Sequence, residues 1–517
     1  MNYWEQRAIE RTKSQHIKSE ELVSRIAKDH DRAMMHIEND ILYYMNRLAD
    51  NLGLSYAELE KKLTKGELNH FRMSLEEYIE KGSGTLTPET IKALELAANM
   101  HEITCRQAMV IEMEKHVSTL FNKYLDSTTT FLAKSYKGEY YRAMFDAQNL
   151  LGYEYIERLD ERKLDMILRR PWTEDGKTFS KRIWENQGKL MIELEKALAY
   201  TSIRGGSAED AINALAKAME ASKYSARRLI HTENAAMASQ ANIDMMRSMG
   251  TAKKYQIVAV LDHKTSDICR EMDGKIFKYS EYKMGETAPT FHPNCRSTII
   301  PYFGDDIERE MDSTRMARDP ITGKSVRVEG DLNYKQWHDK YVKSNPKAVA
   351  KEKAYKNRHS DRKQYERYRE VLGKEAPQSF DKFQDLKYND SKKWEGLKLT
   401  YSDESLKNAI KTKYNLKIHQ GRQGKHIKGH NNYTEGRSFL SEGVDPQKFV
   451  DMYAGTGEIR RDSNGKWIRK QFFEHNKEIG YWIDAESGES HITNRFSISY
   501  SKVKGTHIVP AMPEGVD

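Results

Sequence analysis

The feature that most constrains the fold is a helical pattern of apolar residues, which runs with few interruptions from Tyr3 to about Gly250. In the segment SEELVSRIAKDHDRAMMHIENDILYYMNRLADNL, apolar side chains such as Leu22, Ile26 and Ile37 recur every three or four residues. This spacing places them on one stripe of an α-helix, and a stripe of this kind is typical of a core or a partner-facing surface. The pattern therefore predicts long helices that pack against one another.

A second long helix is expected for AEDAINALAKAMEASKYSARRLIHTENAAMASQANIDMM, with Ser207 as its N-cap after the turn at Gly205 and Gly206. Beyond Gly250 the pattern changes. YQIVAVLD and DGKIFKY are typical of strands, and FHPNCRSTIIPYF closes a small α+β unit near Phe303. Towards the end of the chain, GYWIDAESGESHITNRFSISYSKVKGTHIVPA alternates apolar and polar residues, which predicts an antiparallel sheet of three or more strands.

A chain of 517 residues is too long for one ordinary core, so a multidomain protein is expected. We predict an elongated, mainly α-helical region at residues 1–200 and a small α+β domain at 201–303. A charged helical linker is expected at 304–400, and a C-terminal α+β domain with an antiparallel sheet at 401–517.

Charge is concentrated in one segment of this predicted linker. Residues 335–400 hold 18 Lys and Arg against 10 Asp and Glu, an excess as large as the net charge of +8 on the whole chain. Such a segment is expected to form an extended, protease-sensitive connector without a core of its own. Its basic side chains are either simply solvated or in contact with nucleic acid.

The sequence contains no run of eighteen apolar residues, and its N-terminus lacks the apolar centre of a signal peptide. A soluble protein without a membrane segment, made in a cytoplasm, is therefore expected. The three cysteines are too few for a disulfide framework.

One candidate metal site involves two of these cysteines. His292 and Cys295 form an H-x-x-C pair, and Cys269 lies upstream. Thiolates and imidazoles at such spacing are zinc ligands, although a structural zinc site takes four ligands and only three have suitable spacing here. The alternative is a proline-containing turn with both cysteines as small buried apolar residues.

A second polar cluster is the stretch GKHIKGHNNYTEGRS, from Gly424 to Ser438, which has no hydrophobic run. Metal-independent cleavage of RNA needs a base, an acid and cations that stabilise the phosphorane. Histidine, with an ordinary pKa of about 6.5, can serve as either the base or the acid near neutrality. The alternative is a solvated turn, because glycine and asparagine favour turns.

The candidate residues have different predicted roles. His426 and His507 are the preferred base and acid, and His430 is held in reserve. The remaining candidates are the cations Lys425 and Arg437, the hydrogen-bond donors Ser438 and Thr506, and the substrate-binding residues Tyr433, Tyr500 and Lys502. No cofactor is expected for this domain.

Residues 3–303 resemble the Mu F-like minor head proteins of tailed phages. The resemblance rests on RRLIHTENAAMASQA, on the segment Asp262–Cys269 followed by DGKIF, on HPNCR, and on the segments YWEQRAIERTK and PWTEDGKTFSKRIW. It implies a virion protein inside the head near the portal, with portal and capsid proteins as partners. It also implies presence in the host cytoplasm during assembly and after delivery. Ser297 stands where many members have a second cysteine, which weakens the metal assignment.

Residues 405–513 resemble the polymorphic toxin type 50 family, through KIHQGRQGKHIKGHNNYTEGRSFL and FSISYSKVKGTHIVPAMP. The resemblance implies a ribonuclease with a barnase- and colicin-like fold, an RNA substrate and a cognate immunity protein. Such modules occur as C-terminal fusions to Mu F-like head proteins.

Three functions follow as alternatives. The first is a phage or prophage minor head protein that carries a metal-independent endoribonuclease toxin. The second is a purely structural protein of head morphogenesis or DNA ejection, with a non-catalytic C-terminal binding domain. The third is a metal-dependent DNase toxin, because His430 and Asn431 superficially resemble part of an HNH site.

Overall fold

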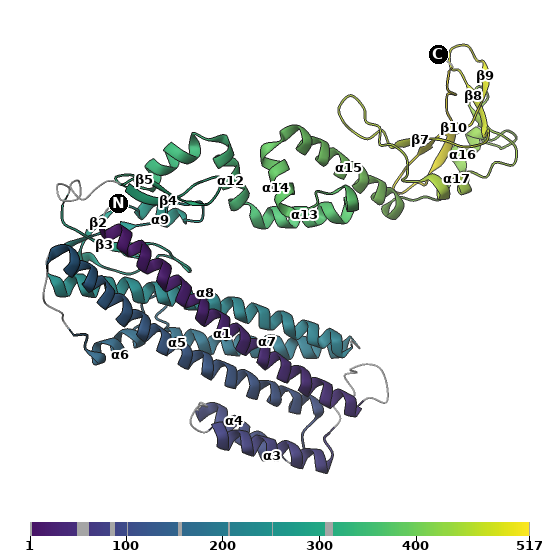
Figure 1. Cartoon of the computed structure of the whole chain (residues 1–517). Helices are drawn as coiled ribbons and strands as arrows, with labels where there is room; N and C mark the ends of the chain where they lie inside the picture. Colours follow the sequence, from purple (N-terminus) through teal and green to yellow (C-terminus); the bar gives the residue numbers. More distant parts are fainter. Residues whose placement is uncertain are drawn as a thin grey trace. The chain divides into compact units, whose positions relative to one another are not determined.

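The computed structural model describes residues 3–48, 62–82, 88–100, 102–152, 158–204, 207–250, 252–304 and 314–515. The chain divides into two compact units, Met1–Asn345 and Pro346–Asp517 (Figure 1). The predicted turn at Gly205 and Gly206 lies outside the described residues.

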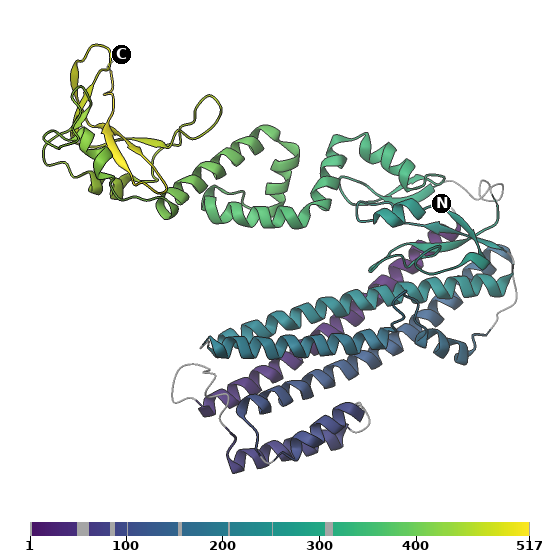
Figure 2. The same ribbon diagram turned by 180° about the vertical axis from the view of Figure 1, so that it is seen from behind.

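The first unit is built on four long helices that run alongside one another (Figures 1 and 2): α1 (Tyr3–Leu48), α5 (Cys105–Leu151), α7 (Phe179–Ile203) and α8 (Ala208–Met249). Shorter helices accompany them, namely α3 (Lys65–Gly82), α4 (Pro88–Ala98) and α6 (Glu161–Arg169). The predicted stripe is confirmed, since Leu22, Ile26 and Ile37 are buried in the bundle. Ser207 caps α8 as predicted, in a reciprocal capping box with Asp210.

A small antiparallel sheet follows the bundle, in the order β2-β1-β3. Its strands are β1 (Lys254–Val258), β2 (Ile276–Lys278) and β3 (Thr298–Tyr302), with α9 (Asp267–Met272) and the 3-10 turn η1 (Tyr279–Glu281) between them. This agrees with the predicted α+β unit. The first unit ends with the hairpin β4 (Thr314–Arg318) and β5 (Ser325–Glu329), α11 (Tyr334–Trp337) and the π-helical turn η2 (His338–Lys343).

The second unit begins with α12 (Pro346–Lys356), α13 (Arg358–Leu372), η3 (Gly373–Glu375), α14 (Phe380–Asn389) and α15 (Ser391–Lys413). These helices correct the prediction of an extended connector without a core. Tyr365, Tyr368 and Phe383 form a buried cluster with Trp394 packed against it, and the rings of Tyr368 and Tyr401 stack at 4.0 Å. A few large aromatic side chains therefore form a core, although the many charged residues of the segment suggested that it had none.

The rest of the second unit contains two three-stranded antiparallel sheets, in the orders β11-β10-β7 and β6-β8-β9. Their elements are α16 (Gln420–Gln423), η4 (Gly424–His426), β6 (Phe439–Leu440), α17 (Pro446–Tyr453), β7 (Lys470–Glu474), β8 (Gly480–Ile483), β9 (Ser490–Thr493), β10 (Arg495–Ser499) and β11 (His507–Pro510). The predicted antiparallel strands are thus present, divided between two sheets. Phe496, Ile498 and Ile508 form the centre of their apolar core.

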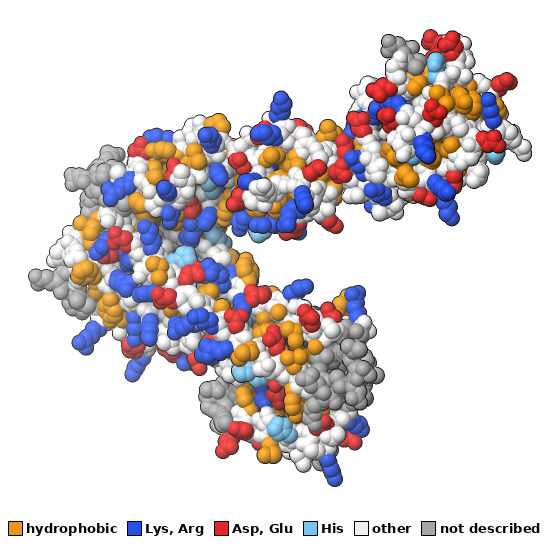
Figure 3. All heavy atoms as spheres, turned by 45° about the vertical axis from the view of Figure 1, so that its right-hand side comes forward, with side chains coloured by type: hydrophobic (Ala, Val, Ile, Leu, Met, Phe, Trp, Pro, Cys, Tyr) orange, Lys and Arg blue, Asp and Glu red, His pale blue; other side chains and the backbone are white. Residues whose placement is uncertain are grey.

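The surface is strongly charged. Figure 3 shows basic and acidic side chains interspersed over the face in view, in keeping with a chain that is 31% charged. None of the described helices has the length and apolar character needed to cross a membrane.

Candidate functional site

The second unit brings His426 and His507 together, although they lie far apart in the sequence. His426 ends η4 and His507 begins β11. Their rings stack with centroids 6.1 Å apart and an interplanar angle of 13°. His426 is only 7% exposed. The structure therefore brings these two candidate residues together.

Gln423 fixes this proximity. Its side chain is 1% exposed and pairs with the backbone of Ile508, the residue after His507. The Ile508 N–H donates to Gln423 Oε1 at 2.8 Å, and Gln423 Nε2 donates to the Ile508 carbonyl at 3.1 Å. The turn that carries His426 is thereby attached to the strand that carries His507.

The hydrogen bond of His426 defines its neutral tautomer. Nδ1 lies 2.7 Å from the carbonyl oxygen of Ser438, which can only accept. Nδ1 therefore carries the proton, and Nε2 holds the free lone pair of the neutral ring. Burial lowers the pKa of His426 despite this hydrogen bond, and the neighbouring cations Arg437, Lys425 and Lys470 lower it further.

The pKa of His507 is lowered to about 4, first by burial and then by electrostatic interaction with the neighbouring His426, Arg422 and Lys470. Without a bound substrate, His507 is therefore neutral at pH 7. Its Nδ1 is buried without a hydrogen-bond partner among the described residues. Two neutral imidazoles surrounded by cations form a site that favours the arrival of an anion.

Strand register adds two residues to this site. Ser499 of β10 lies opposite His507 on one side and opposite Lys470 of β7 on the other. Residues directly opposite one another in a sheet point to the same face, so Lys470, Ser499 and His507 form one row across three strands. Ser499 Oγ is also buried without a partner among the described residues.

Sequence reasoning missed Lys470, Ser499, Gln423 and Arg422. Arg422 and Gln423 lie shortly before His426 in the stretch KIHQGRQGKH, so the sequence alone could have indicated that they are close to it. Lys470 and Ser499 carry no local signal, because only the pairing of the strands brings them to His507.

Two predicted residues lie in the core of the second unit. Thr506 is 0% exposed and its hydroxyl donates to the Asn415 carbonyl at 2.8 Å. Tyr500 is 5% exposed and its hydroxyl donates to Gln471 Oε1 at 2.7 Å. These positions correct the expectation that the Thr506 hydroxyl donates to a substrate and that Tyr500 binds a substrate.

The other predicted residues remain nearer the surface. Lys425 and Arg437 are exposed and act on the pKa of His426. The Ser438 hydroxyl accepts the Ile483 N–H at 3.1 Å. Tyr433 meets the edge of Phe439, and Lys502 lies over the ring of Tyr414, 5.7 Å from its centroid.

His430 is held against Gly424. A Cβ on Gly424 would lie 2.3 Å from the imidazole of His430, so only glycine permits this packing. His430 Nδ1 accepts the Asn432 N–H at 3.0 Å. The ring therefore supports the turn before His426.

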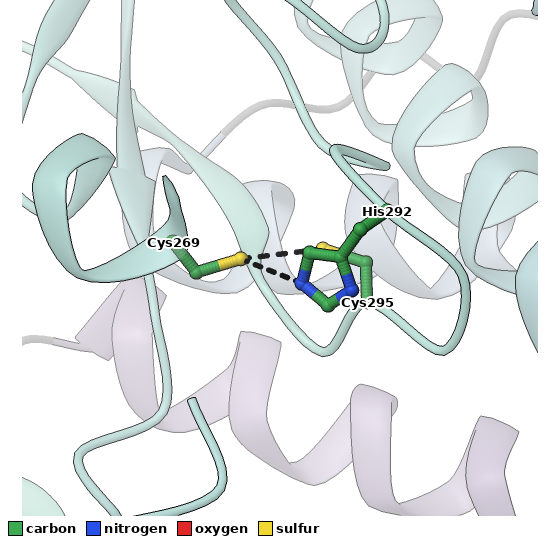
Figure 4. Close-up of side chains that lie close together, drawn as sticks. All are labelled: Cys269, His292 and Cys295. Atoms are coloured by element: carbon green, nitrogen blue, oxygen red, sulfur yellow. Dashed lines mark hydrogen bonds between the residues drawn. The ribbon is translucent and has the colours of Figure 1, made fainter. Parts of the chain in front are cut away.

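The first unit contains a separate cluster of Cys269, His292 and Cys295 (Figure 4). Cys269 Sγ lies 3.2 Å from His292 Nε2 and 3.7 Å from Cys295 Sγ. The hydrogen bond between the two sulfurs lowers the pKa of Cys295 to about 6 and raises the pKa of Cys269 to about 12. The sequence prediction that these three residues converge agrees with this arrangement.

Comparison with known families agrees with both predicted resemblances. Residues 193–300 match the family model for phage Mu protein F like protein, a range that includes Cys269, His292 and Cys295. Residues 418–510 match the model for bacterial toxin 50, a range that includes His426 and His507. Among curated proteins, none is similar enough to this chain to be matched. The chain therefore joins a phage Mu protein F-like domain to a C-terminal bacterial toxin 50 domain.

Proposed function

We propose that this chain is a phage or prophage minor head protein whose C-terminal unit is a metal-independent endoribonuclease toxin. The two family matches support the combination of head protein and toxin. The observation that carries the catalytic proposal is the stacked pair of His426 and His507 among four cations: Arg422, Lys425, Arg437 and Lys470.

His426 is the general base in this proposal. Its lowered pKa keeps it neutral, and its Nδ1 hydrogen bond to Ser438 leaves the Nε2 lone pair available. Nε2 takes the proton of a ribose 2′-hydroxyl, and the 2′-oxygen attacks the adjacent phosphorus. The bond from phosphorus to the 5′-oxygen breaks, which leaves a 2′,3′-cyclic phosphate and a 5′-hydroxyl.

His507 supplies the proton for the leaving 5′-oxygen. In the free unit its low pKa keeps it neutral. A phosphate anion next to the ring favours the protonated form, so substrate binding gives His507 its catalytic proton. Lys470, in the same row of the sheet, stabilises the negative charge that develops on the phosphorane.

The test uses residues 346–517, incubated with single-stranded RNA and with DNA, with and without EDTA. The parent is expected to cleave RNA in EDTA and to leave cyclic phosphate ends. H426A and H507A should each reduce the rate by a factor of about a hundred to ten thousand. H491A is the matched control, because His491 lies on β9, outside the stacked pair. Full activity in both H426A and H507A would overturn the histidine mechanism.

The same experiment separates the alternatives. Cleavage of DNA that EDTA abolishes would favour the metal-dependent DNase, in which His430 would be a central residue. No cleavage of either nucleic acid would favour a purely structural protein. RNA cleavage that survives EDTA supports the proposal.

The proposal includes partners. Portal and capsid proteins bind the first unit, so the chain lies in the virion head. It is also present in the host cytoplasm during assembly and after delivery. A cognate immunity protein protects the producing cell by covering the cations around the histidine pair, and complementary acidic side chains would suit that role. The basic side chains of residues 335–400 contact packaged DNA. Each contact should weaken as salt is raised.

A further inference from the structure

The cluster of Cys269, His292 and Cys295 takes no part in the proposed nuclease chemistry and lies in the other unit. Cys269 lies on α9, whereas His292 and Cys295 lie on the loop before β3. Both cysteines are buried, with 2% and 5% exposure. They form a small apolar cluster with Ala259, and the partly buried Phe291 packs against both this cluster and the main core. So small a cluster gives this corner of the domain little hydrophobic stabilisation.

The distances fit a tetrahedral ion. With Zn–S bonds of about 2.3 Å and a Zn–N bond of about 2.0 Å, the edges of a tetrahedron are about 3.8 Å between two sulfurs and about 3.5 Å between sulfur and nitrogen. The corresponding separations here are 3.7 Å and 3.2 Å. The sulfurs are much further apart than the roughly 2.0 Å of a disulfide. All three ligand atoms lie within 4.8 Å of one another.

His292 is oriented as a metal ligand. Its Nδ1 lies 2.8 Å from the Pro293 carbonyl, so Nδ1 carries the proton and the Nε2 lone pair points towards Cys269. The loop is also fixed from outside. The Asn294 N–H donates to Thr232 Oγ1 on α8 at 3.0 Å, and Arg296 pairs with both carboxylate oxygens of Asp262. The loop is thereby held in place independently of any ion.

We propose that Cys269 Sγ, Cys295 Sγ and His292 Nε2 bind one Zn²⁺, with water as the fourth ligand. Binding releases the protons of the thiols and involves no change of oxidation state. Among the described residues, only these three supply ligand atoms that converge here, so the fourth position is left to water. The ion would cross-link α9 to the loop before β3 and stabilise the sheet of the first unit.

The chain provides its own control for the test. Cys105 is the third cysteine, is buried at the start of α5, and lies outside the cluster. The full chain and its C105S, C269S and C295S variants would be purified under reducing conditions without chelator. Zinc would be measured by mass spectrometry. The parent and C105S are expected to hold about one zinc per chain, and C269S and C295S less than about a tenth of that.

Two measurements on the parent keep the proposal testable if a variant does not fold. Replacement of zinc by Co²⁺ should produce the thiolate-to-metal charge-transfer band and the visible bands of tetrahedral cobalt. Chelator should lower the melting temperature of the first unit, and Zn²⁺ but not Mg²⁺ should restore it. A parent chain without stoichiometric zinc or cobalt bands would overturn the proposal. Two further results would also overturn it: a Cys269–Cys295 disulfide in the purified chain, or a loss of zinc in C105S equal to that in C295S.

Discussion

Gln423 shows how one buried side chain can hold two candidate site residues near each other. It supplies both a donor and an acceptor to the backbone of Ile508, and it is 1% exposed. Truncating it would leave the N–H and the carbonyl of Ile508 unsatisfied, and each unsatisfied buried group costs about 1–3 kcal/mol. Its role is therefore to position His426 against His507.

We expect Q423A to lower the free energy of unfolding of residues 346–517 by at least about 1–3 kcal/mol, with a loss of the proposed ribonuclease activity. Gln420 provides the control, because it lies exposed on the same short helix and its replacement by alanine should change stability by less than about 0.5 kcal/mol. Urea unfolding measures both variants. Equal effects of the two substitutions would rule out the positioning role.

The low pKa of His507 predicts a pH dependence of stability. Its pKa is about 4 in the folded unit and about 6.5 in an unfolded chain. The unfolded state therefore binds the proton more tightly, so stability is complete above about pH 6.5 and is lost as the pH falls towards 4. The loss is about 2 kcal/mol, given the partial exposure of the ring. His426, whose pKa is also lowered, acts in the same direction.

The measurement is urea unfolding of residues 346–517 at about pH 7 and about pH 5. Carboxylates also contribute to acid sensitivity, so the informative quantity is the difference between the parent and H507Q. The variant should lose less stability than the parent over this interval. An equal loss in both would mean that His507 is not held neutral by its surroundings.

At the scale of elements, helices α13 to α15 show how few apolar residues a small core requires. Their segment is rich in Lys and Arg, yet Phe383 is 0% exposed and lies between Tyr365, Tyr368 and Trp394. Asp361, also 0% exposed, pairs with Lys387 at 2.7 Å. Charge counting predicted an open connector because it gives no weight to the size of aromatic side chains.

We expect limited trypsin digestion to leave residues 358–401 intact, despite their many Lys and Arg. F383A should expose the segment to cleavage, because removing a buried phenylalanine costs about 3–5 kcal/mol. F380A is the milder control, since Phe380 is only partly buried. Rapid cleavage of the parent within this segment would instead restore the extended-connector prediction.

At the scale of the whole molecule, the division between two compact units separates the two family matches. The Mu F-like match lies in Met1–Asn345 and the toxin match lies in Pro346–Asp517. Each unit has its own apolar core. This separation predicts that head assembly and toxicity can be divided at the boundary.

A chain truncated after Asn345 should still be incorporated into phage heads and should not inhibit bacterial growth. Residues 346–517 alone should inhibit growth and should be absent from heads. Immunoblots of purified heads and growth curves after induction test both expectations, with the full chain as the positive control. Heads that lack the truncated chain but contain the full chain would show that the second unit is needed for assembly.

The sequence by itself determined the elements and the candidate histidines. Helical spacing, the Ser207 cap and strand alternation are local properties, and His426 and His507 were visible from their clustering and family motifs. Only the tertiary structure decided which residues meet. Period-two alternation gives the face of each strand but not its register, so it could not place Lys470 and Ser499 beside His507. The sequence also could not show that Thr506 and Tyr500 are buried. Their hydroxyls are satisfied inside the fold by Asn415 and Gln471, which lie elsewhere in the chain.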